Sequence, residues 1–141
     1  MDAERSEDLA VLAKLDQLNA LVFARDPAVI DELWSDLGFR LVGSELGEVA
    51  QTRDELAALI KALFAKPFRI SWVWADRHVT RHGDLAWALA EGELETTYSD
   101  RTERAPYRLL CIFQNVDDRW RWRLFNGSAP APHSAAPGGD S

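Results

Sequence analysis

Cysteine is nearly absent from this 141-residue sequence, which contains only Cys111. An internal disulfide, a cysteine metal cluster and a CxxC redox motif are therefore excluded. Basic residues are also scarce relative to acidic ones, since 16 Lys and Arg stand against 23 Asp and Glu and give a formal charge of -7. A surface of that sign repels phosphate groups, so we expect neither nucleic acid nor a membrane as a partner.

Long hydrophobic runs are missing as well, because no stretch approaches the roughly 18 apolar residues of a membrane-spanning helix. Residues 1–8 are acidic, where a signal peptide would be basic and then apolar. Together with the single cysteine, these features lead us to expect a cytoplasmic protein.

Several motifs of familiar catalysis are also lacking, namely a glycine-rich phosphate loop, a nucleophile elbow and HExxH. His78 and His82 have a spacing that suits metal ligands on a helix, but they fall on a predicted strand and its turn. No cysteine or third histidine lies near them in the sequence to complete a set of metal ligands. We therefore expect neither a metal nor another cofactor.

The composition that remains is that of one folded domain, with 47% hydrophobic and 28% charged residues. Residues 129–141 are the exception, because they consist of Ala, Pro, Gly, Ser, one His and one Asp. Such a segment offers nothing to bury. We expect a single domain over residues 1–128, followed by a disordered tail over residues 129–141.

Helical periodicity predicts three helices in the first half of the chain, over residues 6–24, 27–37 and 52–64. Ser6 is the expected N-cap of the first helix, and Thr52 with Glu55 forms a capping box for the third. A short strand over residues 39–44 is expected between the second and third helices. The apolar stripe of the first helix is expected to consist of Leu9, Leu12, Leu15, Leu18 and Val22.

From residue 68 onward the hydrophobic period changes from 3.6 to 2. Turn signals at residues 82–83, 99–100 and 117–118 divide this half into four long strands. Consecutive strands joined by tight turns form an antiparallel meander. Helices followed by strands predict an α+β fold, in which the helices pack on one face of a curved, mostly antiparallel sheet.

Three segments resemble a known family: AKPFRISW at residues 65–72, GDLAW at 83–87 and WRWRLFNGS at 120–128. With the order of the elements, they resemble a SnoaL-like subgroup of the nuclear transport factor 2-like superfamily. This resemblance implies a cystatin-like cone of three helices on a strongly curved sheet. It also implies a pocket between the helices and the concave sheet face, and a homodimer formed through the sheet.

The resemblance does not imply one activity, because this fold hosts isomerases, dehydratases, hydrolases, cyclases and proteins that only bind. The ketosteroid isomerases of the superfamily use a tyrosine, a base and a buried carboxyl. Their pattern places Leu18, Leu41 and Leu110 at or near these positions, and all three are apolar. Isomerisation of that type is therefore not expected.

Alternation along the four strands sorts their side chains onto two faces, and both are apolar enough to be covered. We call these the first and the second face. Matching the strand that begins at residue 83 to the pattern of the ketosteroid isomerases places the second of them on the pocket side. The first face carries Val73, Ala75, Ala86, Ala88, Ala90, Tyr107, Leu109, Cys111, Phe113, Trp122, Leu124 and Asn126. The second carries Trp72, Trp74, Trp87, Leu89, Glu91, Glu93, Arg108, Leu110, Ile112, Arg123 and Phe125.

Indoles beside arginines on the second face suggest a small ligand with an acidic or carbonyl oxygen, because rings stack on indoles and guanidinium groups bind oxygens in pairs. The alternative interpretation is that the charged residues form cross-strand ion pairs on a solvated sheet, and that the tryptophans are ordinary core. The predicted ligand-binding residues are Trp72, Trp74, Trp87, Glu91, Arg108, Arg123 and Phe125.

Three functions remain open from the sequence. The preferred one is a dimeric protein that binds an unassigned small molecule. The second is an enzyme of cyclase, dehydratase or hydrolase type, in which Glu91 or Glu48 acts as acid or base. The third is a protein-interaction module, which a filled cone would favour.

Overall fold

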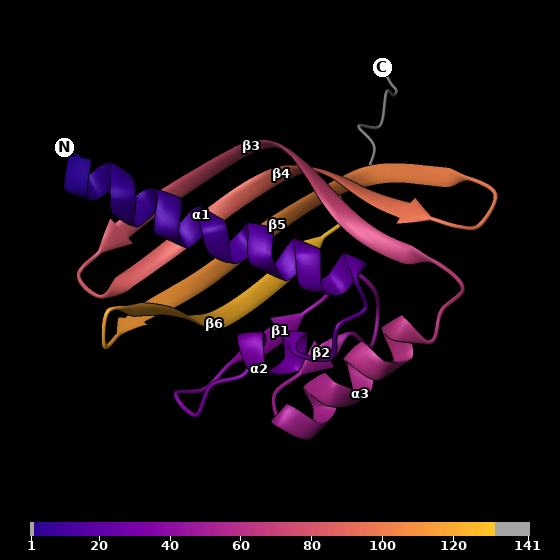
Figure 1. Ribbon diagram of the computed structural model, residues 1–141, viewed down its shortest axis with the longest axis horizontal. Helices are drawn as coiled ribbons and strands as arrows, with labels where there is room; N and C mark the ends of the chain where they lie inside the picture. Colours follow the sequence, from indigo (N-terminus) through magenta and orange to yellow (C-terminus); the bar gives the residue numbers. More distant parts are fainter. Residues whose placement is uncertain (1, 132–141) are drawn as a thin grey trace, which may run out of the picture.

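The computed structural model describes residues 2–131. For residues 2–4 it describes the backbone alone. Three helices lie on one side of a six-stranded sheet, where α1 crosses the four long strands and α2 and α3 lie beside β1 and β2 (Figure 1). The helices are α1 (Asp2–Phe23), α2 (Val29–Leu33) and α3 (Arg53–Phe64). The strands are β1 (Arg40–Val42), β2 (Val49–Ala50), β3 (Arg69–His82), β4 (Leu85–Thr97), β5 (Thr102–Val116) and β6 (Arg119–Ser128).

The sheet has the strand order β2-β1-β6-β5-β4-β3. All neighbouring strands are antiparallel except β1 and β6, which are parallel and pair Leu41 with Phe125. The predicted meander of four long strands and the α+β class are therefore confirmed. None of the helices within residues 2–131 is both long enough and apolar enough to cross a membrane.

The predicted cap of α3 is present. Thr52 adopts extended backbone, and its hydroxyl accepts a hydrogen bond of 3.1 Å from the Glu55 N–H. The Glu55 carboxylate accepts a bond of 2.8 Å in return, but from the N–H of Gln51 and not from that of Thr52. The start of α3 is thus fixed by its own side chains, as the sequence indicates.

The prediction for α1 was wrong at its start and on its buried face. The helix already begins at Asp2, so Ser6 lies within it and is not its cap. Leu9 is 55% exposed. The buried stripe has the spacing i, i+4, i+7, i+11 and consists of Val11, Leu15, Leu18 and Val22.

Helix α2 is shorter than predicted, because the backbone leaves the helix at Trp34 (φ -79°, ψ 139°). Ser35 follows, and its hydroxyl accepts a hydrogen bond of 3.0 Å from Leu37 N–H, a local contact that competes with helix. Tertiary contacts hold the single remaining turn in place. The Glu32 carboxylate pairs with Lys14 Nζ at 2.7 Å and accepts a hydrogen bond of 2.9 Å from Trp122 Nε1.

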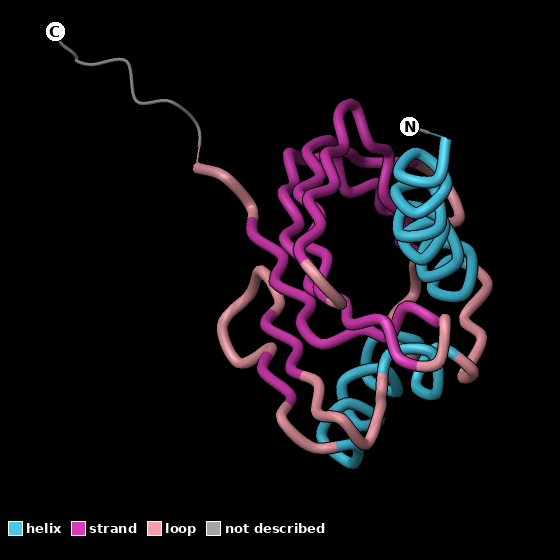
Figure 2. The backbone as a smooth tube through the Cα atoms, turned by 90° about the vertical axis from the view of Figure 1, so that its left-hand side faces the viewer, coloured by secondary structure: helices cyan, strands magenta, loops and turns pink. Residues whose placement is uncertain are grey.

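Two β-bulges change which side chains face the helices. The pairing of β3 with β4 shifts between Trp74 and Asp76, and that of β5 with β6 shifts between Ile112 and Phe113. The first bulge needs Gly92 on the opposite strand, because a Cβ there would lie 2.1 Å from the carbonyl oxygen of Val73. The strands curve toward α1, which runs along the open side of the sheet (Figure 2).

The helices cover the first of the two predicted faces over most of the sheet, and the assignment of the second face to the pocket side was wrong there. We call the side toward the helices the inner face and the opposite side the outer face. Leu85, Trp87 and Leu89 lie on the outer face and are 38–39% exposed. The inner face carries Ala86, Ala88, Ala90, Leu109, Cys111, Phe113 and Trp122, each at most 1% exposed.

The predicted tail begins at residue 129, and residues 129–131 have no helix or strand. The rest of that prediction, residues 132–141, lies outside the described residues.

Candidate functional site

Three of the seven predicted ligand residues lie together on the inner face. Trp72 and Trp74 precede the first bulge, and their rings are stacked with centroids 6.4 Å apart and an angle of 5°. Phe125 follows the second bulge, and its ring lies 6.1 Å from that of Trp72. Tyr107, which the sequence assigns to the opposite face, completes the group at 6.0 Å from Trp72 and 6.3 Å from Trp74. We call these four residues the inner aromatic cluster.

The cluster continues as a chain of rings through the core. Phe125 lies 6.4 Å from Trp122, and Trp122 lies 4.5 Å from Phe113. Phe113 and Trp122 are both 0% exposed. The inner aromatic cluster is thus continuous with the aromatic core of the sheet.

Tyr107 is the titratable member of the cluster, and its pKa is shifted. Burial raises its pKa to about 12, and the nearby Glu48 carboxylate acts in the same direction. The nearby Trp72 and Ser44 side chains act in the opposite direction and lower this pKa. Trp72 Nε1 lies near enough to the Tyr107 oxygen to lower the pKa of Tyr107. Within residues 2–131, however, this buried N–H makes no hydrogen bond.

Glu48 is brought near Tyr107 by the turn between β1 and β2. Its carbonyl accepts a bond of 2.7 Å from Gly43 N–H, and its Oε1 accepts one of 2.9 Å from Glu45 N–H. A Cβ at Gly43 would collide with the Glu48 side chain, so glycine is needed there. Of the two carboxylates considered as acid or base, Glu48 is near a buried proton donor, whereas Glu91 is not.

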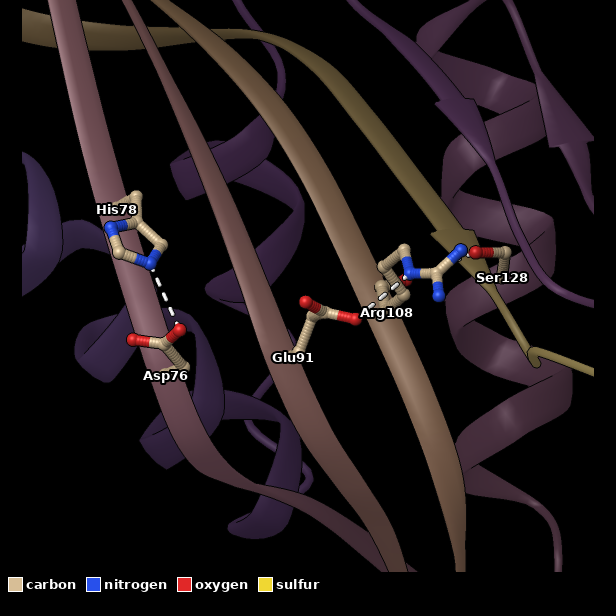
Figure 3. A network of polar contacts seen from close by, with 5 residues as sticks. All are labelled: Asp76, His78, Glu91, Arg108 and Ser128. Atoms are coloured by element: carbon tan, nitrogen blue, oxygen red, sulfur yellow. Dashed lines mark hydrogen bonds and ion pairs between the residues drawn. The ribbon is translucent and has the colours of Figure 1, made fainter.

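A second group of predicted residues lies on the outer face. Trp87 is 38% exposed, and the Glu91 carboxylate pairs with Arg108 Nε at 3.2 Å. Asp76 and His78 form a neighbouring pair at 2.9 Å. These polar side chains lie on the side of the sheet turned away from the helices (Figure 3). Glu91 and Arg108 thus form a cross-strand ion pair, as the alternative interpretation of the sequence predicted for the charged residues.

Arg123 belongs to neither group, because it is the extra residue of β6 at the second bulge. Its Nε donates a hydrogen bond of 2.8 Å to the Gly38 carbonyl, and its Nη1 donates to Gln114 Oε1. Arg123 therefore ties the segment after α2 to the sheet. The structure therefore does not bring the predicted indoles and arginines together in one pocket.

Two of the recesses on the surface of the described residues have linings that do not include the inner aromatic cluster. One has a volume of about 490 Å³ and includes Asp8 and Arg81, which pair with each other at 2.8 Å. The other has a volume of about 290 Å³ and lies between the segment after α2 and the ends of β5 and β6. Its lining consists of Trp34, Ser35, Asp36, Leu37, Val116 and Arg121.

The remaining reactive side chains have structural explanations. Cys111 is 0% exposed, and burial raises the pKa of its thiol to about 12, so it acts as a small core residue. His78 is engaged with Asp76. No group of three or more His, Cys, Asp or Glu side chains gathers to hold a metal ion in the described part of the chain.

Known structures share this architecture at low sequence identity. A nuclear transport factor 2-like protein from Streptomyces avermitilis, named as a candidate dehydratase, has a TM-score of 0.81 at 13% identity, covering 92% of this chain and 99% of its own. A superfamily protein from Salmonella enterica has a TM-score of 0.75 at 12% identity, covering 98% and 99%. A cystatin-like protein from Novosphingobium aromaticivorans has a TM-score of 0.71 at 20% identity, covering 95% and 90%.

No curated protein matches the chain significantly. The family model of the SnoaL-like domain, in contrast, matches residues 11–132, which span α2, α3, every strand and most of α1. This match shows that the chain belongs to the SnoaL-like domain family, and its cone of helices on a curved six-stranded sheet is the fold of the nuclear transport factor 2-like proteins.

Proposed function

We propose that this protein acts as a homodimer that binds a small molecule, and that the outer face of the sheet forms the dimer interface. The observation that carries the proposal is a strip of apolar side chains in register across three strands of that face. Two of them are 38–39% exposed, and the others are half-buried. This outer apolar strip consists of Trp87, Leu89, Leu110, Ile112 and Leu124.

Burial of this strip by a second copy follows from the one-sided cover of the sheet. The helices protect only the inner face, so the strip is left in water in a single chain. A two-fold axis through the strip would bury the same residues of both copies. The sequence assigns the second face to the pocket and so leaves the first face, with Leu109, Cys111, Phe113, Trp122 and Leu124, for the partner. In the structure only Leu124 of these five lies on the outer face, because the other four lie under the helices.

Sedimentation velocity tests the dimer. At micromolar concentration we expect a species of about twice 15.9 kDa, and Leu89→Glu should convert it to a monomer. Leu46→Glu is the matched control, because Leu46 is an equally apolar, fully exposed side chain in the turn between β1 and β2. A monomeric wild type, or dissociation of both variants alike, would contradict the proposal.

For the small molecule, we propose that the inner aromatic cluster binds a compact ring with a neutral carbonyl oxygen. Trp72 Nε1 and the Tyr107 hydroxyl offer donors to such an oxygen. The negative field of Glu48 at Tyr107 disfavours an anionic oxygen at the same place. Of the two ligand types expected from the sequence, the carbonyl compound is therefore favoured here over the acid.

Tryptophan fluorescence during titration with small cyclic ketones tests this site. Trp72→Phe should weaken binding because it removes the donor and keeps a ring. Trp120→Phe is the matched control, since Trp120 Nε1 is also buried without a partner but lies on β6 outside the cluster. Arg108→Met should have no effect on binding, because Arg108 is on the outer face. Equal affinity of Trp72→Phe and wild type would contradict the site.

A further inference from the structure

The two surface recesses differ in what their charged groups do. In the larger one, Asp8 and Arg81 neutralise each other. In the smaller one, Asp36 and Arg121 line the same space, but their side chains form no ion pair or hydrogen bond with each other or with any other residue of the described chain. An acidic and a basic group thus face one recess without partners.

The wall of this smaller recess is held in place by other contacts. Gly38 N–H donates to the Ser35 carbonyl at 3.0 Å, and Leu37 N–H donates to the Ser35 hydroxyl at 3.0 Å. Arg123 Nε binds the Gly38 carbonyl at 2.8 Å and ties the loop to β6. Arg121 itself is paired with Gln114 in the β5–β6 ladder. The two charged residues are therefore presented by a fixed framework, which lowers the entropic cost of binding a ligand between them.

The charges of the recess restrict the ligand more than its shape does. A simple anion attracted by Arg121 would be repelled by Asp36, and a simple cation would meet the opposite conflict. A molecule with both an anionic and a cationic group can satisfy both residues at once. The volume of about 290 Å³ lies just below the range of about 300–1,000 Å³ for small-molecule pockets, which excludes large ligands.

We propose that this recess binds a small zwitterion, namely a free amino acid with an apolar side chain. Its carboxylate would bind the Arg121 guanidinium, and its ammonium group would bind the Asp36 carboxylate. Trp34, Leu37 and Val116 supply the apolar wall for the side chain. The inference concerns a different place from the inner aromatic cluster and does not depend on the homodimer.

Isothermal titration calorimetry with L-leucine as the probe tests the ligand class. Because both charged residues are accessible to water, we expect a weak Kd of about 0.1–1 mM. L-Leucinamide lacks the carboxylate and N-acetyl-L-leucine lacks the ammonium group, so each should bind at least about fivefold more weakly. Binding of either derivative as tightly as L-leucine would overturn the zwitterion assignment, as would no binding of L-leucine at about 10 mM.

Variants of the full chain test the location. Arg121→Gln and Asp36→Asn should each weaken L-leucine binding by at least about fivefold. Arg119→Gln is the matched control, because Arg119 is an exposed arginine on the same strand outside the recess. Unchanged affinity in both recess variants would overturn the proposal. Sedimentation of the same variants separates this result from the homodimer, whose state they should leave unaltered.

Discussion

The two faces of the sheet are both apolar, but they use side chains of different size. On the inner face of β4, alanines lie at positions 86, 88 and 90, all 0% exposed, and Ala86 is paired with the large ring of Phe113. On the outer face of the same strand, Trp87 and Leu89 remain partly in water. Small residues beside large ones allow dense packing under a helix. Along β4, residue size therefore identifies the covered face where hydrophobicity alone does not.

The largest expected contrast between the faces comes from one indole on each. Trp122→Ala should lower the free energy of unfolding by about 3–5 kcal/mol, because it leaves a cavity in the core and removes the donor to Glu32. Trp87→Ala should lower it by less than about 1 kcal/mol when measured at low protein concentration. Urea unfolding of both variants gives the comparison, and similar losses would mean that the faces are not distinct.

Alkaline pH should destabilise the inner face through Tyr107. Its folded pKa of about 12 lies above the ordinary value of 10.0, so the folded state binds this proton more tightly. The contribution of Tyr107 to the free energy of unfolding is therefore fully present below pH 10 and is lost as the pH rises toward 12.

Between pH 10 and pH 12, the free energy of unfolding should fall by about 2–3 kcal/mol more in wild type than in Tyr107→Phe. Cys111→Ala is the control, because it should keep the part of the slope that belongs to Tyr107. Parallel pH profiles for wild type and Tyr107→Phe would show that Tyr107 ionises as freely in the folded state as in the unfolded one.

The first bulge should be sensitive to a single methyl group. Gly92→Ala places a Cβ against the Val73 carbonyl, which is backbone, so the strand must shift at a cost of about 1–3 kcal/mol. Gly127→Ala meets the hydroxyl end of the Tyr107 side chain instead. A side chain can move more easily than a paired strand, so this variant should lose less stability. Thermal unfolding of the two variants decides the order.

The smallest effect is expected from the ion pair on the outer face. Glu91 and Arg108 have side chains that are 54% and 48% exposed, and exposed pairs contribute about 0–1 kcal/mol. Glu91→Gln should therefore change the free energy of unfolding by less than about 1 kcal/mol, with a dependence on salt. A larger loss in urea unfolding would indicate that Glu91 has a structural role beyond the pair.

Much of the fold could be predicted because its signals are local. The period of two, the turn residues and the cap of α3 each depend on neighbours in the sequence. Asp117 and Asp118, for example, adopt positive φ values of 54° and 64° in the turn between β5 and β6, as acidic residues tolerate in such turns.

The candidate site could not be predicted in the same way, because the two bulges depend on contacts between distant strands. Each bulge reverses the alternation, so Trp72 and Phe125 point inward while Trp87 and Arg108 point outward. Gly92 was a signal for the first bulge, since glycine within a strand often marks close approach of another backbone. The proximity of Glu48 to Tyr107 had no local signal.

The parallel pairing of β1 with β6 has a consequence for how the chain reaches its native state. Leu41 finds its partner Phe125 only after most of the chain has been made. During synthesis, the edge of β1 that pairs with β6 therefore stays unpaired until the last strand has been made. Such distant pairing slows folding. A ribosome-bound chain that ends before residue 119 should thus stay incomplete and depend on chaperones.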